Sequence, residues 1–376
     1  MFKKIASVLI AAAMTVSLAS CGGSGAASTG STAPAAESKA ESAASGAATS
    51  SAAGTESKTA EASTDLPKEV NIGVQTLVTP ELVARYEKLY EEYLGCKVNL
   101  LQFDSGADVN RAFASKSIDI GMIGTSPAAI GISTDLGYEV IWFADVIGAA
   151  ETLVAKKDSG IATVKDLVGK KVATPFASTA HFSLQNAMSL NGVNPADVEL
   201  YDMQPDDIYA AWVRGDIDAA YVWDPVLSKL FAEDGVSITN SAELAEQGTV
   251  TADLVVANKE FAEKYPSIPT NYIKAQLKAI ELYNTDKDKA VTEIAEAIDI
   301  TKEEAETQVN GFKYPDGAEQ LTDAYFGADG ESGEIAQILK KSADFLVEQG
   351  SIDSAPELSV FEEYSTGEYI LRAMNE

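Results

Sequence analysis

The sequence predicts an α/β fold of two lobes, with two mostly parallel sheets, flanking helices, a ligand cleft between the lobes and a helical C-terminal region. From position 66 onward, short apolar strands alternate with helical segments, which is the order expected of βαβ units. The same alternation begins again after residues 151–155. Everything beyond residue 259 has helical periodicity, which predicts the C-terminal region.

The first lobe takes its expected strands from short apolar runs at residues 70–75, 97–103, 119–123 and 139–143. Between them we expect helices at 80–94, 107–115 and 126–133. The longest of these segments, PELVARYEKLYEEYL, repeats its apolar side chains at helical spacing through Leu82, Leu89 and Tyr93.

The second lobe repeats this order after an extended crossing at 151–155, with expected strands at 171–174, 198–201 and 219–222. We expect one helical turn at 163–167, a helix that residues 177–180 lead into and that ends at 190, and helices at 205–214 and 225–232. A strand at 254–257 could return the chain, which predicts lobe 1 as 66–153 with 254–376 and lobe 2 as 154–253. The expected C-terminal helices are 261–264, 272–283, 287–297, 302–309, 318–325 and 334–349.

The N-terminus resembles a lipoprotein signal. Lys3 and Lys4 precede an apolar run at 5–18, which is too short to span a bilayer stably but fits a secretory signal. The run ends in Leu-Ala-Ser-Cys, and Cys21 stands where a bacterial lipobox has its lipidated cysteine. We therefore expect residues 1–20 to be a signal peptide and Cys21 to carry lipid. The alternative is an ordinary signal peptide with an incidental cysteine.

Residues 21–65 are almost entirely Ala, Ser, Gly and Thr, and they cannot bury enough apolar surface to offset their ordering entropy. They predict a disordered tether. The chain has only two cysteines, Cys21 and Cys96, so lipidation of the first leaves no intrachain disulfide to expect. The formal net charge of −29 argues against nucleic acid and against anionic lipid headgroups as partners.

Several loops that follow predicted strands are rich in Gly, Ser and Thr. They are 75–76, 104–106, 124–127 and 176–181, and the last three lead into helices. Backbone N–H groups at a helix start have no intrahelical partner and carry partial positive charge. Several starts that converge could hold an anion without arginine. The alternative is plain helix capping by Ser105, Ser126 and Ser178.

Acidic residues near these loops would then recognise a cation. They are Asp104, Glu151, Asp224 and Asp253, and each could instead be a helix cap or a surface charge. Trp223 and Phe176 could form apolar walls or belong to the core.

His181, the single histidine, could donate a hydrogen bond to an oxyanion or lie at the surface. A lone histidine cannot form a His-based metal cluster. The sequence also contains no GxSxG, HExxH, CxxC, P-loop or GxGxxG motif, so we expect a binding protein without catalytic residues, metal or cofactor, rather than an enzyme.

The same loops carry a resemblance to the taurine-binding periplasmic proteins of ABC importers, within the taurine, sulfonate and nitrate group. The similar stretches are 103–107, 120–127, 175–181, 210–223, 251–254 and 261–266, so the resemblance runs from residue 70 to at least 266. It implies the bilobed type II periplasmic-binding-protein fold, in which two lobes close on a ligand and deliver it to a permease.

Carried over by position, the resemblance implies that loops facing the family's ligand cleft hold Gln75, Asp104, Ser105, Thr125, Ser126, Ser178, Thr179, His181, Trp223 and Asp253. Glu151 matches an acidic position at the lobe crossing. The sequence departs from the family pattern at Ala180, where a second hydroxyl is frequent, and at Asp224, where close relatives are often uncharged. The added carboxylate could strengthen amine recognition or indicate another ligand.

These observations together predict an extracytoplasmic, lipid-anchored, monomeric solute-binding protein that delivers taurine to a permease and, through it, to an ATPase subunit. It would lie on the outer face of the cytoplasmic membrane in a Gram-positive bacterium and in the periplasm otherwise. The alternatives are a receptor for aliphatic sulfonates or another small anion or zwitterion, an enzyme on the same fold, and a surface adhesin or structural lipoprotein.

Overall fold

The structure is a computed structural model that describes residues 66–328 and 333–376. The predicted signal peptide at 1–20, the predicted tether at 21–65 and the lipidation of Cys21 lie outside the described residues. None of the helices in the described ranges combines the length and apolar character needed to cross a membrane.

The first sheet has six strands in the order β11-β4-β10-β3-β1-β2. Strands β1 to β4 run in one direction, whereas β10 and β11 run in the other. All five residues of the inner strand β3 are buried, as expected of a strand covered on both faces. The bounds are β1 (Glu69–Val74), β2 (Lys97–Gln102), β3 (Ile120–Gly124), β4 (Tyr138–Ile147), β10 (Ala252–Asn258) and β11 (Phe312–Lys313).

The second sheet has five strands in the order β7-β6-β8-β5-β9, and β5 alone runs against the others. Its two faces bury alternate residues: Leu153 and Tyr221 belong to one cluster, and Val154 and Val222 to another. The bounds are β5 (Glu151–Lys156), β6 (Lys171–Thr174), β7 (Glu199–Asp202), β8 (Ala219–Trp223) and β9 (Gly235–Asn240). The predicted α/β class with two sheets is therefore confirmed. Both sheets are mixed, because β5 and β10 each pair antiparallel with both neighbours.

Helices before the second crossing flank both sheets. They are α1 (Glu81–Tyr86), α2 (Leu89–Leu94), α3 (Gly106–Ala114), α4 (Thr125–Ser133), α5 (Thr179–Leu190), α6 (Pro205–Arg214), α7 (Val226–Ala232) and α8 (Ser241–Ala245), with 3-10 turns at Val164–Leu167 and Pro195–Asp197. The single helix predicted at 80–94 is wrong, because Lys88 has φ 59° and separates α1 from α2.

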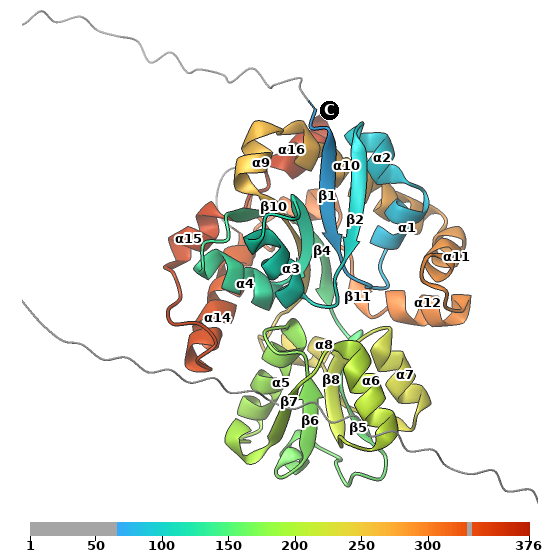
Figure 1. Cartoon of the computed structure of the whole chain (residues 1–376), viewed down its shortest axis with the longest axis vertical. Coiled ribbons are helices and arrows are strands. Elements are labelled where there is room, and N and C mark those ends of the chain that lie inside the picture. Colours follow the sequence, from blue (N-terminus) through green and yellow to red (C-terminus); the bar gives the residue numbers. More distant parts are fainter. Residues whose placement is uncertain (1–65, 329–332) are drawn as a thin grey trace, which may run out of the picture. The chain divides into compact units, whose positions relative to one another are not determined.

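The C-terminal helices, drawn from gold to red in Figure 1, gather around the first sheet. They are α9 (Lys259–Lys264), α10 (Ser267–Thr285), α11 (Lys287–Ile298), α12 (Lys302–Val309), α13 (Gly317–Gln320), α14 (Glu334–Glu348), α15 (Leu358–Glu363) and α16 (Glu368–Asn375). The helix predicted at 318–325 is limited to α13, and β9, α8, β11, α15 and α16 were not predicted.

The chain passes from the first sheet to the second between Ile147 and Glu151. Here Gly311 holds the passage in place, because its carbonyl accepts hydrogen bonds from Gly148 N (2.9 Å) and Ala150 N (3.2 Å). A Cβ at Gly148 would lie 2.6 Å from that carbonyl oxygen, so this close approach requires glycine. The chain returns after α8 through β10. The predicted lobe boundaries at 153/154 and 253/254 stay predictions.

Candidate functional site

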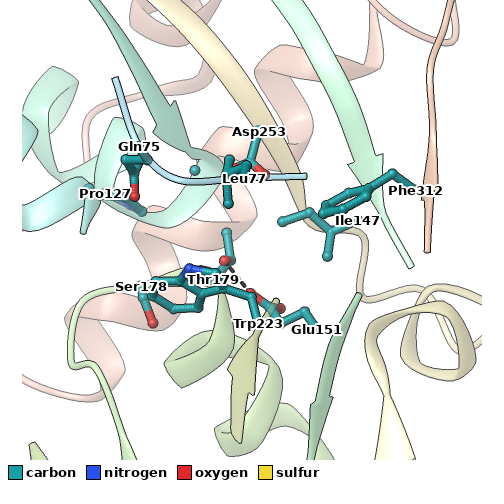
Figure 2. A pocket seen from close by; sticks show the side chains of 12 residues that line it. Gln75, Leu77, Pro127, Ile147, Glu151, Ser178, Thr179, Trp223, Asp253 and Phe312 are labelled. Atoms are coloured by element: carbon teal, nitrogen blue, oxygen red, sulfur yellow. Dashed lines mark hydrogen bonds between the residues drawn. The ribbon is translucent and has the colours of Figure 1, made fainter. Parts of the chain in front are cut away.

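A cavity of about 370 Å³, including space open to solvent, is lined by residues from both sheets and their loops. Figure 2 shows Gln75, Leu77 and Asp253 on one side of it and Ser178, Thr179 and Glu151 on the other. The remaining lining residues are Gly106, Gly124, Pro127, Ile147, Trp223 and Phe312.

Three helix starts meet at this cavity, as the sequence predicts. Ser105, Gly124 and Ser178 are the N-caps of α3, α4 and α5, and each has extended backbone angles. Gly106, Gly124 and Ser178 line the cavity. Free N–H groups and partial positive charge from three helices therefore face one space, which suits an anion.

The hydroxyl groups at these starts differ in their partners. Ser178 Oγ donates to Pro175 O (2.5 Å) and accepts from His181 N (3.1 Å), whereas Ser105 Oγ donates to Asp108 Oδ2 (2.9 Å). Thr125 Oγ1 and Ser126 Oγ are fully buried, and neither has a hydrogen-bond partner in the described protein.

Thr125 and Ser126 do not line the cavity themselves, but they stand in the sequence between two residues that do, Gly124 and Pro127. Buried hydroxyls normally have a hydrogen-bond partner, so this pair leaves capacity for a bound group or water.

On the opposite side, Glu151 is buried beneath the start of α5. Its carboxylate accepts hydrogen bonds from the hydroxyls of Thr179 (2.5 Å), Ser241 (2.7 Å) and Ser183 (3.3 Å). Burial raises the pKa of Glu151 to about 7, although these hydrogen bonds lower it. The sequence placed an acid at this crossing, and the structure brings it to the cavity.

Two further acids lie together where β4 and β10 pair. Asp253 lines the cavity, and its pKa is raised to about 7 by burial and then by the charge of Glu151. Asp145 is its partner in the antiparallel ladder and is fully buried, which raises its pKa well above the ordinary value. Neither oxygen of Asp145 has a hydrogen-bond partner in the described residues.

Sequence reasoning missed Asp145, because the predicted strand ended at residue 143 whereas β4 continues to Ile147. The apolar Val146 and Ile147 after the aspartate were the available signal. Despite this acidic group, the described residues contain no cluster of three or more His, Cys, Asp or Glu suited to a metal ion.

Six predicted site residues are not among those that line this cavity: Asp104, Ser105, Thr125, Ser126, His181 and Asp224. Asp104 is exposed and lines a neighbouring cavity that shares Trp223. Asp224 is instead a helix cap, because its Oδ1 accepts from Ser228 N (3.0 Å) and Ser228 Oγ (2.6 Å) at α7. Burial raises its pKa to about 6.

His181 lies inside the first turn of α5 and is not among the residues that line the cavity. The ring stacks on exposed Phe176 with 4.4 Å between centroids, and its Nε2 lies 3.2 Å from Gln185 Nε2. Burial lowers the pKa of His181 to about 4, so the ring is neutral near pH 7.

Predicted site residues that do line the cavity are Gln75, Glu151, Ser178, Thr179, Trp223 and Asp253. The side-chain nitrogen of Gln75 is already committed, because it donates to Met122 O (3.0 Å). Lining residues absent from the predicted set are Leu77, Gly106, Gly124, Pro127, Ile147 and Phe312. The glycines and proline could have been chosen from the predicted loops, whereas the apolar residues carry no distinguishing signal.

Two α/β units, each built on its own sheet, line one cavity from two sides, which is the arrangement of a solute-binding protein. Residues 75–290 match the NMT1/THI5-like family, and the chain belongs to that family. The chain is 33% identical to the taurine-binding periplasmic protein of Escherichia coli K12 over 80% of this chain and 92% of that protein. It is 25% identical to a putative aliphatic sulfonates-binding protein of Bacillus subtilis 168, over 76% and 83% respectively.

The fold is also that of a solved structure, the alkanesulfonate-binding protein SsuA from Xanthomonas axonopodis pv. citri bound to MOPS. The TM-score is 0.68 at 19% identity, with 80% of this chain and 99% of that chain covered. This likeness confirms the bilobed binding-protein fold. These relatives are named as binding proteins, in agreement with the expectation that the chain is not an enzyme.

Proposed function

We propose that this protein binds taurine in the cavity between its two sheets and delivers it to an ABC permease. The observation that carries the proposal is that groups suited to an anion and groups suited to a cation line the same small cavity. The starts of three helices line it from some loops, and the acids Glu151 and Asp253 line it from others. Such a site suits a short zwitterion.

The sulfonate end would lie against the starts of α3, α4 and α5. A sulfonate stays ionised and offers three acceptor oxygens, which matches backbone N–H groups and the unpartnered hydroxyls of Thr125 and Ser126. Ser105, Ser178 and Thr179 belong to the same turns, so their N–H groups contribute to this half of the site.

The ammonium end would lie between Asp253 and Glu151, which line the cavity from different sheets. Taurine has only about seven non-hydrogen atoms, and the best small ligands gain at most about 1.5 kcal/mol per atom. Micromolar binding therefore requires that nearly every polar atom be paired and that water be excluded. Closure of the two lobes over the ligand would meet both requirements.

The cellular setting of the proposal is extracytoplasmic. The periplasmic location in the name of the Escherichia coli relative supports it, and the basic start and Leu-Ala-Ser-Cys sequence support a lipid anchor at Cys21. The partners would be the permease and, through it, the ATPase subunit, with the binding protein acting as a monomer.

A receptor for aliphatic sulfonates is the second candidate. One observation favours it: Leu77, Ile147, Trp223 and Phe312 give the cavity an apolar part that would suit an alkyl chain. Such a ligand would leave Asp253 and Glu151 without a partner, because it has no cation.

Isothermal titration calorimetry with the purified protein separates the two candidates. We expect taurine to bind at least tenfold more tightly than ethanesulfonate, which has a methyl group in place of the aminomethyl group. Equal affinities, or tighter binding of ethanesulfonate, would refute recognition of the amine. Failure of both ligands to bind would refute the sulfonate site altogether.

A further inference from the structure

The acids Asp145, Glu151 and Asp253 form a buried group without a cationic neighbour. The charge of Glu151 acts on both of the others. Titratable groups facing them from other elements are tyrosines: Tyr314, after β11, faces Asp145, and Tyr221, in β8, faces Glu151. Within the described residues, no lysine or arginine shifts the pKa of any of the three acids.

Asp145 differs from Glu151 in the hydrogen bonds that its carboxyl group accepts. Glu151 accepts hydrogen bonds from three hydroxyl groups, which can stabilise a buried carboxylate. Asp145 is fully buried with both oxygens unpartnered. An aspartate retained only for packing would normally have hydrogen-bond donors around it, so this residue requires another explanation.

That explanation lies in its position beside the cavity. Asp145 in β4 is the ladder partner of Asp253 in β10, and burial and then the charge of Asp253 raise the pKa of Asp145. Asp253 is the member of the pair that lines the cavity. Two carboxyl groups this close cannot both be ionised in a buried setting, so the pair holds one proton between them.

We propose that Asp145 is a positioning residue that shares a proton with Asp253 in the empty protein, and that the ammonium group of the ligand displaces this proton. The inference rests on the proposed function, because it requires a ligand with a cationic end. The charges balance: a pair with one proton carries one negative charge, and a fully ionised pair with a bound ammonium carries the same total. The displaced proton leaves to solvent.

This arrangement explains how a protein with several acids at one cavity can stay folded without a ligand and still distinguish an aminosulfonate from a simple sulfonate. A simple sulfonate has no cation and cannot displace the proton, so the proton stays on the pair. An aminosulfonate exchanges its ammonium for the proton, so the total charge at the acid pair does not change, and the negative charge of its sulfonate lies at the helix starts.

The test is proton release, measured by calorimetry at pH 7 in buffers of different ionisation enthalpy. We expect taurine to release about one proton from the wild-type protein and ethanesulfonate to release none. In Asp145→Asn, the new amide can donate to Asp253, which is then ionised before the ligand arrives, so release by taurine should fall by more than half. Glu139→Gln is the matched control, because Glu139 is a buried acid at the other end of β4 that accepts from Tyr369 (2.9 Å).

Release in Glu139→Gln should equal that of the wild type. Taurine binding to wild-type protein without proton release would overturn the inference and leave the proposed function standing, even if Asp145→Asn fails to fold. Unchanged release in a folded Asp145→Asn variant would also overturn it. Failure of wild-type protein to bind taurine would refute the proposed function itself.

Discussion

At the scale of the residue, buried ionisable groups decide how the protein responds to pH. Burial lowers the pKa of His181 to about 4 and raises that of Glu151 to about 7. Both shifts have the same physical cause, the loss of solvation of the charged form. Their effects on the pH dependence of stability are opposite: as pH falls, the shift of His181 lowers the free energy of unfolding, whereas that of Glu151 raises it.

For His181, the unfolded chain binds a proton below pH 6.5, whereas the folded protein does so only near pH 4. The free energy of unfolding therefore decreases as pH falls through this range. We predict that His181→Gln decreases this loss by about 2 kcal/mol between pH 7 and pH 5, as measured by urea unfolding. The acids contribute equally to both proteins, so the difference between the two isolates the histidine. Parallel pH profiles for variant and wild type would contradict the prediction.

Residue identities near strand ends were predictable, but side-chain directions were not. The sequence placed Glu151, Ser178 and Asp253 at strand ends or crossings, and all three line the cavity. It placed His181 equally close, yet that ring stacks on Phe176 and does not line the cavity. The direction of a ring depends on neighbours that the linear pattern does not specify.

At the scale of the element, the turns after the strands bring the two sheets close to each other. Gly124, the N-cap of α4, approaches α5 so closely that a Cβ there would lie 2.7 Å from Thr179 Cγ2. The backbone of Gly124, with φ −70° and ψ 161°, accepts any residue, so the restriction comes from Thr179 alone.

We predict that Gly124→Ala weakens taurine binding at least tenfold, because overpacking by a single methyl group typically costs about 1–3 kcal/mol. Adding Thr179→Ser should restore affinity, since serine lacks Cγ2 and keeps the hydroxyl that donates to Glu151. Calorimetry on the two variants and on Thr179→Ser alone checks the idea. An equally weak double variant would rule out the steric explanation.

Most elements with an apolar pattern were predicted, whereas a break inside such a pattern and very short or exposed elements were not. The helix breaks at Lys88, between α1 and α2, without a nearby glycine or proline that would indicate it. The sequence therefore predicted one helix from 80 to 94. Strand β11 has two residues and β9 is largely exposed, so neither has the apolar pattern on which the prediction relied.

At the scale of the whole molecule, the C-terminal helices contact elements of both sheets. Helix α14 packs against α4, and its Phe345 meets Phe182 of α5 edge to face with 4.8 Å between ring centroids. Gln308 of α12 donates to Ser228 of α7 (2.9 Å). The order of elements predicted the two sheets and the helical end. It did not predict these contacts, because they join segments far apart in the chain.

We predict that Phe345→Ala weakens taurine binding about fivefold, although Phe345 does not line the cavity. An edge-to-face pair contributes about 1 kcal/mol, and losing it loosens α5, whose first turn lines the site. Phe231→Ala, at a 40% exposed position of α7, is the control and should bind as the wild type does. Calorimetry provides the comparison, and equal affinities for Phe345→Ala and the control would exclude this coupling.

The placement of the three indoles has a practical consequence. Trp142 and Trp212 are sealed inside the protein, whereas Trp223 is half-buried and borders both the main cavity and its neighbour. A solute that arrives in the cavity changes the polarity around one tryptophan and leaves the other two unaffected. Trp223 is therefore an intrinsic fluorophore at the binding cavity, and its emission spectrum can follow ligand binding in real time without an added dye.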